Sequence, residues 1–180
     1  MAGDGLRLLE WFRGRRRAFP WRTPLPRDPY AVVVAEVMAQ QTQIERVVPA
    51  YGRFVARFPT LASLAAAAED EVVHAFSGLG YYRRARSLHR AARAVVAQGA
   101  WPTTHEELRQ LPGFGDYTAA AVAAFCFGGK RPPVDGNIAR VAARVRALML
   151  PLGSAKLIRA AEDLATVLFA ETDTPKPGRR

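Results

Sequence analysis

The sequence predicts an all-α fold, and three observations lead to this prediction. Apolar residues recur at helical spacing through nearly the whole chain. No stretch alternates apolar and polar residues between hairpin signals, as a half-buried strand would. Residues typical of helix ends also flank the periodic segments, for example Asp28 directly before Pro29, a common pair of cap and first-turn residue.

Helices are expected over each periodic segment. In chain order these segments are 5–17, 28–41, 44–58, 60–67, 69–78, 81–99, 104–111, 115–127, 137–148 and 154–170. Gly78 and Gly99 follow two of them as terminators. Thr104 and Glu107 form a capping box at the start of a short helix. Segment 19–27 contains three prolines and is expected to be an irregular connection.

One compact domain is expected for residues 1–170, because the chain has 180 residues and its 49% hydrophobic content is enough for a sizeable core. Residues 171–180 are expected to form a frayed tail. The face of the last helix that should be buried carries Leu157, Ala161, Leu164 and Leu168.

The charge balance points to a polyanionic partner. Lysine and arginine number 26 against 16 acidic residues, which leaves a net charge of +10 at pH 7. A strongly positive surface attracts nucleic acid, and double-stranded DNA is the leading candidate. Charge alone leaves a merely soluble basic protein about as well supported, so the motifs must decide.

Cys126 is the only cysteine, which excludes an internal disulfide and any four-thiolate metal or iron–sulfur site built by these residues alone. It lies in an apolar run, where a buried structural thiol is expected rather than a nucleophile. The apolar runs are too short to span a bilayer, and no charged-then-apolar leader opens the sequence. The expectation is a monomeric, cytoplasmic protein associated with the nucleoid.

The segment LPGFGDYTAAAVAAF joins a short helix to a longer apolar one and contains Gly113 and Gly115. Glycines allow a tight turn there, and the amides at the start of the second helix then point at an anion, with the helix dipole behind them. Such a turn binds a DNA phosphate without reading sequence. An ordinary helix–helix turn remains the alternative on the spacing alone.

At this point the sequence resembles a known family. The hairpin, placed at residues 107–125, is similar to the helix-hairpin-helix signature of the DNA glycosylases related to endonuclease III, with the adenine DNA glycosylases the most similar branch. The resemblance covers residues 8–170 and rests on motifs in the family's order, namely PWR, DPYAVVVAEVMAQQTQ, ARFPTLASLA, GLGYYRRARSLHRAA, LPGFGDYTAAAV and VDGNIARV. It implies an endonuclease III-like helical bundle and the release of adenine mispaired with guanine or 8-oxoguanine.

Two carboxyl groups are candidates for the chemistry, because the departing base needs a proton and the sugar becomes oxocarbenium-like. Glu36 lies in the apolar run VVVAEVMA, where burial would raise its pKa; a glutamate that reaches solvent or pairs with an arginine is the alternative. Asp135 reads locally as a helix N-cap. The resemblance implies that Glu36 is the general acid, Asp135 the catalytic aspartate facing the sugar, and Asn137 their support.

Tyr117 decides between two reaction types. Bifunctional relatives carry a lysine at this place in the hairpin, which forms a Schiff base and leads to strand cleavage. A phenol cannot form that imine. The resemblance therefore implies a monofunctional enzyme that leaves an abasic site.

Recognition requires that the adenine be rotated out of the stack. By resemblance, Gln41 and Tyr81, with Leu79, probe the mismatch, and Trp21 and Arg22 border the adenine pocket. Ordinary packing is the alternative for the pair Tyr81 and Tyr82, and it is expected for one of them. A helix facing the DNA backbone is expected to carry Arg83, Arg84, Arg86 and Arg90, although a solvated helix face would look the same.

The sequence also departs from the family pattern. Adenine glycosylases continue with another helix that packs on the N-terminal helices, four cysteines that hold a four-iron four-sulfur cluster, and a domain that recognises 8-oxoguanine. None of these is in the 180 residues, so no cofactor is expected. A thymine–guanine mismatch glycosylase and a non-catalytic DNA-binding remnant are the alternatives; the string AQQTQ argues against the first.

Overall fold

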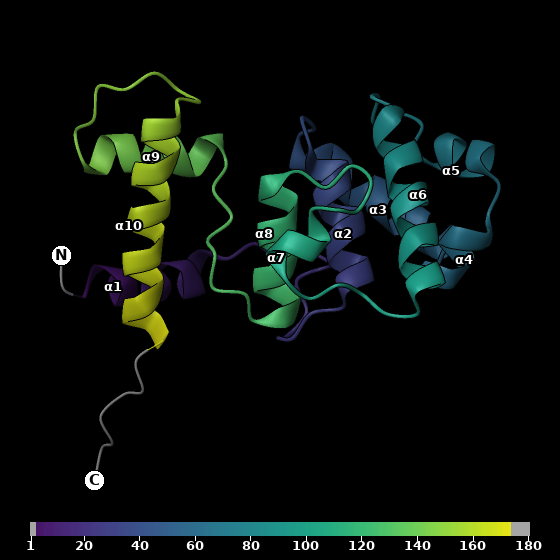
Figure 1. Cartoon of the computed structure of the whole chain (residues 1–180), viewed down its shortest axis with the longest axis horizontal. Helices are drawn as coiled ribbons and strands as arrows, with labels where there is room; N and C mark the ends of the chain where they lie inside the picture. The colour runs from purple at the N-terminus through teal and green to yellow at the C-terminus, as the bar shows by residue number, and fades with distance from the viewer. Residues whose placement is uncertain (1–2, 174–180) are drawn as a thin grey trace, which may run out of the picture. The chain divides into compact units, whose positions relative to one another are not determined.

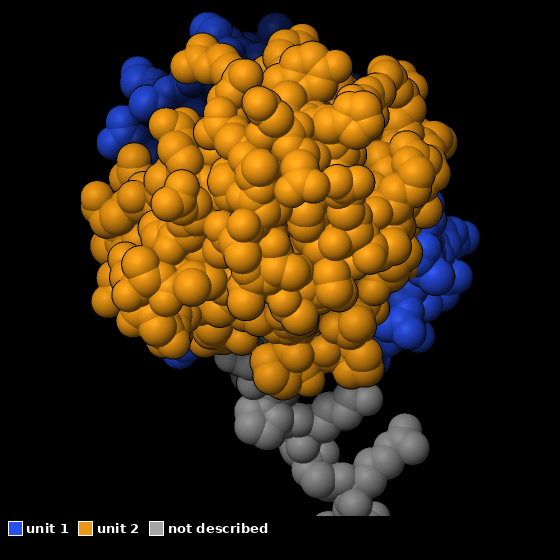
Figure 2. Space-filling model, turned by 90° about the vertical axis from the view of Figure 1, so that its right-hand side faces the viewer, with its two compact units in different colours: residues 1–18, 130–180 blue, residues 19–129 orange. Residues whose placement is uncertain are grey.

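The computed structural model describes residues 3–173, and the chain forms two compact units (Figure 2). Unit 1 comprises Met1–Ala18 and Lys130–Arg180, and unit 2 comprises Phe19–Gly129. The described residues form helices and no strand, which confirms the all-α prediction. No helix within the described part of the chain is long and apolar enough to cross a membrane.

Unit 2 is built around helix α2 (Figure 1). Its helices are α2 (Pro29–Ala39), α3 (Ile44–Arg57), α4 (Leu61–Ala66), α5 (Glu69–Ala75), α6 (Arg83–Gln98), α7 (His105–Leu108) and α8 (Asp116–Phe127). Helix α2 contacts α3, α6 and α8, while α4 and α5 pack on α6 and α7 packs on α8. The core therefore surrounds α2, which is buried on most of its circumference.

The sequence of α2 explains both its start and its central position. The Asp28 carboxylate accepts hydrogen bonds from the amides of Tyr30 (3.0 Å) and Ala31 (3.4 Å), and Pro29 occupies the first turn. These are the cap and the proline that the sequence predicted. Apart from Tyr30 and Glu36, the rest of the helix consists of valine, alanine and methionine, and neighbouring helices cover these apolar residues on several sides.

Unit 1 has a smaller core. It consists of α1 (Asp4–Arg15), α9 (Gly136–Val145) and α10 (Ala155–Asp173), with α10 packed on both other helices. Its core cluster contains Ala139, Ala142, Leu157, Ala161 and Leu164, and Leu168 packs against it, so the predicted face of the last helix is confirmed. Several apolar side chains of α1 stay exposed, namely Leu6, Leu8, Trp11 and Phe12.

The helix ends differ little from those expected from the sequence. The short helix expected over 104–111 is helical only at His105–Leu108, and the residues up to Gly113 form the turn. Gly99 ends α6 in a left-handed conformation, as predicted. Helix α10 continues through Asp173, and residues 174–180 of the expected tail lie outside the described part of the chain.

Candidate active site

The predicted hairpin consists of α7, a turn and α8. Thr104 caps α7 by accepting from the amide of Glu107 (3.3 Å), and the Glu107 carboxylate accepts from the amide of Thr104 (3.3 Å). Asp116, the first residue of α8, closes the hairpin. Its Oδ1 lies 3.2 Å from Nε2 of the buried His105 and 3.7 Å from Nε of Arg109.

The two glycines of the turn have different structural roles. Gly113 has a φ of +81°, and a Cβ there would lie 2.5 Å from the Ser87 Cβ of α6. Its backbone conformation and the closeness of α6 both require glycine. Gly115 has an ordinary φ of −80° and open space around it. It is the N-cap of α8 and, as a glycine, provides no side-chain cap to this helix.

Tyr117 is the second residue of α8 and is half-buried. The next residue, Thr118, is buried, and its Oγ1 accepts a hydrogen bond of 3.4 Å from Nε2 of Gln40. The second helix of the hairpin is therefore tied directly to the end of α2.

Glu36 is the one charged residue on α2, and its side chain is half-buried among buried valines and alanines. Helix α8 packs on α2, and the negative charge of Glu36 contributes to raising the pKa of the Cys126 thiol on α8. Burial is the main cause of that shift, which brings the pKa of Cys126 to about 12. The thiol is buried, as expected from its apolar run.

Gln41 and Tyr81 occupy two short loops with the same unusual backbone conformation. Gln41, after the end of α2, has a φ of +52°, and Tyr81, before α6, has a φ of +50°. Both side chains are exposed, whereas Leu79 is buried and packs in the core. Tyr82 is exposed as well, so the expectation that one tyrosine of the pair packs internally is wrong.

The expectation that Arg84 faces the DNA backbone is wrong. Arg84 is 9% exposed and does not face outward with its neighbours on α6. Its guanidinium donates to carbonyl groups at the end of α2 and in the loop before Tyr81, and it lies over the rings of Phe76 (5.9 Å) and Tyr81 (5.5 Å). Burial lowers the pKa of Arg84 from its usual value.

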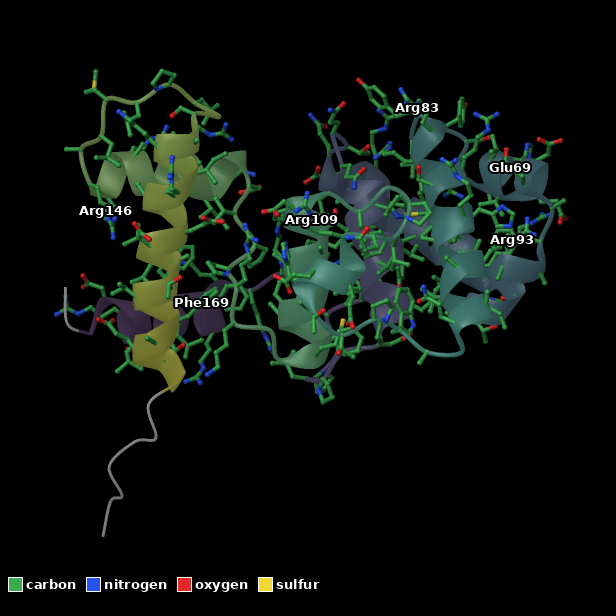
Figure 3. All side chains as sticks on the ribbon, viewed as in Figure 1. Glu69, Arg83, Arg93, Arg109, Arg146 and Phe169 are labelled. Carbon is green, nitrogen blue, oxygen red and sulfur yellow. The ribbon has the colours of Figure 1, made fainter. Side chains whose placement is uncertain are left out.

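The other arginines at the start of α6 are exposed, as expected. Figure 3 shows Arg83 at the beginning of the helix and Arg93 farther along it. Arg86 pairs with Glu69 of α5 at 3.0 Å, with both side chains about half exposed. Such a surface pair is weak and leaves the guanidinium able to exchange its partner for a phosphate.

Trp21 and Arg22 lie in the irregular connection before α2. Trp21 is buried, stacks on Phe19 with ring centroids 5.0 Å apart, and contacts Tyr51 at 4.9 Å. Arg22 is exposed and its guanidinium lies 4.8 Å from the centre of the Phe19 ring. Trp21 is therefore part of the core, and a contact of either residue with a base stays a prediction.

In unit 1, Asp135 and Asn137 form one hydrogen-bonded group at the start of α9. Asp135 Oδ1 accepts from the amides of Asn137 (2.9 Å) and Ile138 (2.8 Å). Its other oxygen, Oδ2, accepts from the side-chain amide of Asn137 (2.8 Å), whose Oδ1 in turn accepts from Arg140. The cap predicted for Asp135 is thus present, and the carboxylate is held in a fixed orientation.

Sequence reasoning missed Arg140 altogether and missed the burial of Arg84. Arg140 stands three residues after Asn137 on a helix, so the spacing was an available signal. For Arg84 there was none, because nothing in the string YYRRAR separates the one buried arginine from its exposed neighbours.

An iron–sulfur cluster does not fit the residues present. A four-iron four-sulfur cluster needs four thiolates, and the sequence contains Cys126 alone. Residues 3–173 also contain no group of three or more histidine, cysteine or acidic side chains placed to hold a metal ion.

Comparisons with curated proteins find adenine DNA glycosylases. That of Rattus norvegicus is 44% identical over 180 residues, covering 95% of this chain and 34% of that protein. That of Homo sapiens is 47% identical, covering 78% and 28%, and that of Mycolicibacterium smegmatis is 40% identical, covering 80% and 50%. The chain thus spans between about a quarter and a half of the length of these relatives.

Solved structures share the fold. A thermostable thymine-DNA glycosylase has a TM-score of 0.78 and 28% identity, with 92% of this chain and 76% of that chain covered. Endonuclease III in a trapped covalent DNA intermediate has a TM-score of 0.73 at 18% identity, covering 96% and 87%, and supports the fold alone. Residues 34–159 match the profile of the family described as "HhH-GPD superfamily base excision DNA repair protein". The chain therefore belongs to the HhH-GPD superfamily of base excision DNA repair proteins.

Proposed function

We propose that the chain is the catalytic core of a monofunctional DNA glycosylase that binds double-stranded DNA and releases adenine mispaired with guanine or 8-oxoguanine. The curated relatives in three organisms are all adenine DNA glycosylases. The observation that carries the proposal is Glu36, a single half-buried carboxyl in an otherwise apolar helix at the centre of unit 2.

Glu36 supplies the proton for the departing base. The apolar side chains of α2 partly shield this carboxyl group from water, which is the kind of environment in which enzymes place a general acid. A protonated carboxyl can donate to a ring nitrogen of adenine, which then leaves as a neutral base.

Asp135 supplies negative charge for the sugar. As the glycosidic bond breaks, positive charge develops at the sugar carbon, and a fixed carboxylate stabilises it without having to reorganise. The hydrogen bonds from the side chain of Asn137 and from two backbone amides hold the Asp135 carboxylate in a fixed orientation. Arg140, which donates to Asn137, extends this support.

Tyr117 supports a reaction that ends with base release. A lysine here would attack the sugar carbon and form an imine, but a phenol has no amine to do so. Water completes the hydrolysis, and the DNA strand stays intact.

DNA is held by backbone contacts in this proposal. The N-terminus of α8, where the helix dipole is positive, is the proposed phosphate site, and exposed arginines of α6 such as Arg83 add positive charge. The net charge of +10 supports the same partner. The residues assigned to the flipped adenine and the mispair are Gln41, Tyr81, Trp21 and Arg22.

An adenine-release assay tests the proposal. Single-turnover reactions should use duplexes with adenine opposite guanine, 8-oxoguanine or thymine, and Glu36→Gln as the inactive control, since its amide keeps the shape but cannot donate the proton. Release from the two mispairs and not from the adenine–thymine pair is expected. Absence of release from every adenine duplex would reject the proposal.

A second candidate function is thymine release from thymine–guanine mispairs, favoured by the structural likeness to a thymine-DNA glycosylase. A duplex with thymine opposite guanine, in the same assay, separates the two functions. Binding of all duplexes without release of either base would indicate a non-catalytic DNA-binding protein.

A further inference from the structure

We propose that Arg84 is a positioning residue for mispair recognition, which holds the two loops that carry Gln41 and Tyr81 in one arrangement. The Gln41 loop is residues 40–42 and the Tyr81 loop is residues 79–81. This inference rests on the proposed function in one respect, that Gln41 and Tyr81 contact the mispair.

The guanidinium of Arg84 connects the two loops directly. On one side it donates to the carbonyl of Gln40 and to Oγ1 of Thr42 (3.2 Å), the residues before and after Gln41. On the other it donates to the carbonyls of Leu79 and Gly80 (3.1 Å each), the two residues before Tyr81. One side chain thus spans loops that lie about forty residues apart in the sequence.

Both loops need such a restraint. Gln41 and Tyr81 have φ values of +52° and +50°, in the left-handed region that is unfavourable for a residue with a side chain. A strained conformation of this kind persists only where the surroundings fix it. Because Arg84 bonds the backbone immediately beside each strained residue, it determines which way the two exposed side chains point.

Arginine is suited to this position and lysine is not. The planar fork presents Nη1 to the carbonyls of Val37 (3.1 Å), Met38 (3.0 Å) and Gln40, and Nη2 to the acceptors of the other loop and Thr42. A lysine ammonium has one nitrogen and three donors, so it can satisfy only part of this set. Within residues 3–173 no carboxylate pairs with Arg84. Its hydrogen-bond acceptors are backbone carbonyl oxygens and the hydroxyl of Thr42.

A purely structural role is the competing explanation, since the carbonyls of Val37 and Met38 belong to the end of α2. A cation there stabilises the helix through its dipole. The test therefore needs measurements that a general loss of stability would not change selectively.

The test variant is Arg84→Lys, with Arg53→Lys as the matched control at an exposed position on α3. Amide hydrogen exchange reports on each loop without DNA: the Thr42 amide bonds to the carbonyl of Ala39 (3.2 Å) and the Leu79 amide to that of Phe76 (3.2 Å). Both should exchange about ten-fold faster in Arg84→Lys, while Leu64, bonded to Thr60 in another part of unit 2, keeps its rate. Equal acceleration at all three amides, or at none, would overturn the proposal.

Binding measurements then test the link to recognition. Arg84→Lys should lower the preference for a duplex with adenine opposite 8-oxoguanine over a matched duplex about ten-fold, with matched-duplex affinity changed less than about two-fold. In a background of Tyr81→Ala and Gln41→Ala, the same substitution should have little further effect on that preference, because Arg84 acts through those side chains. If Arg84→Lys lowered the preference by the same factor in this background as in the wild-type chain, the positioning role would be contradicted.

Two outcomes keep this inference separate from the proposed function. If the wild-type chain releases no adenine but the exchange pattern is as expected, the proposed function fails and the loop restraint stands. If release is normal and Arg84→Lys keeps the wild-type preference, the inference fails alone. Should Arg84→Lys not fold, Thr42→Val removes the bond from Arg84 to Thr42 Oγ1 and the bond from Thr42 Oγ1 to the Gln40 carbonyl, and it is expected to accelerate exchange in the Gln41 loop only.

Discussion

Replacing Gly113 by alanine tests how closely the hairpin is held against α6. The left-handed backbone at this residue, with a φ of +81°, costs alanine about 1–2 kcal/mol. The new Cβ would lie 2.5 Å from the Ser87 Cβ, which requires the turn to move. Overpacking of this kind costs about 1–3 kcal/mol. We therefore expect Gly113→Ala to lower the free energy of unfolding by about 3 kcal/mol and Tm by about 10 °C.

Gly115→Ala is the matched control. Gly115 lies two residues away with an ordinary φ of −80° and no atom near the position of a Cβ. Exchanging glycine for alanine at an N-cap costs about 1 kcal/mol or less. Urea denaturation followed by far-UV circular dichroism measures both variants. If both variants lost the same free energy of unfolding, or if Gly113→Ala were as stable as wild type, the turn at Gly113 would not be held tightly against α6.

Three further predictions follow from the site. Asp135→Asn should abolish base release and lower the free energy of unfolding by about 1 kcal/mol, because the cap is weakened and charge at the start of α9 is lost; a release assay and a thermal melt measure these, and a fully active variant would reduce Asp135 to a cap. The wild-type chain should form no borohydride-trapped cross-link to substrate DNA, since Tyr117 replaces the imine-forming lysine; a trapped complex would mean that another amine is the nucleophile. The pKa of Cys126 is about 12 in the folded chain against a usual 9.0, so the unfolded thiol ionises first and the free energy of unfolding should fall above about pH 9 by up to about 1.4 kcal/mol per pH unit; denaturation at pH 8 and pH 10 checks this, and Cys126→Ala should remove the thiol's share of the fall.

The elements of the fold were predictable because their signals are local. Asp28 and Pro29 begin α2, Thr104 and Glu107 cap α7, and Gly99 ends α6, each through contacts within a few residues of chain. The periodicity of apolar residues determined which face of each helix would be buried. These predictions needed no knowledge of which helices pack together.

Burial of single polar residues was not predictable, because it depends on distant parts of the chain. Arg84 was expected on an exposed face with Arg83 and Arg86. Its guanidinium instead donates to carbonyls at the end of α2 and in the loop before Tyr81. The end of α2 is separated from Arg84 in the sequence by α3, α4 and α5. For Tyr82 the sequence could not show whether the side chain packs internally or stays exposed, because that too depends on distant parts of the chain. A periodic pattern shows which positions of a helix align but not which aligned polar group finds buried acceptors.

The two candidate carboxyl groups differ in how far the sequence could describe them. The cap geometry of Asp135 is local, and only its connection to Arg140 was missed. The half-buried state of Glu36 depends on neighbours that cover α2, so the apolar run could suggest desolvation but not its extent. Their catalytic roles come from the family resemblance and from chemistry, and they stay predictions.

Single-turnover release of adenine from a duplex with adenine opposite 8-oxoguanine tests most directly whether Glu36 is the general acid of this protein. The wild-type chain and Glu36→Gln are compared. The wild-type chain should release the base and leave an abasic site without cutting the strand. Glu36→Gln should bind the duplex with nearly unchanged affinity and release no base, because only the proton donor is lost. Measurable release by Glu36→Gln would contradict the account.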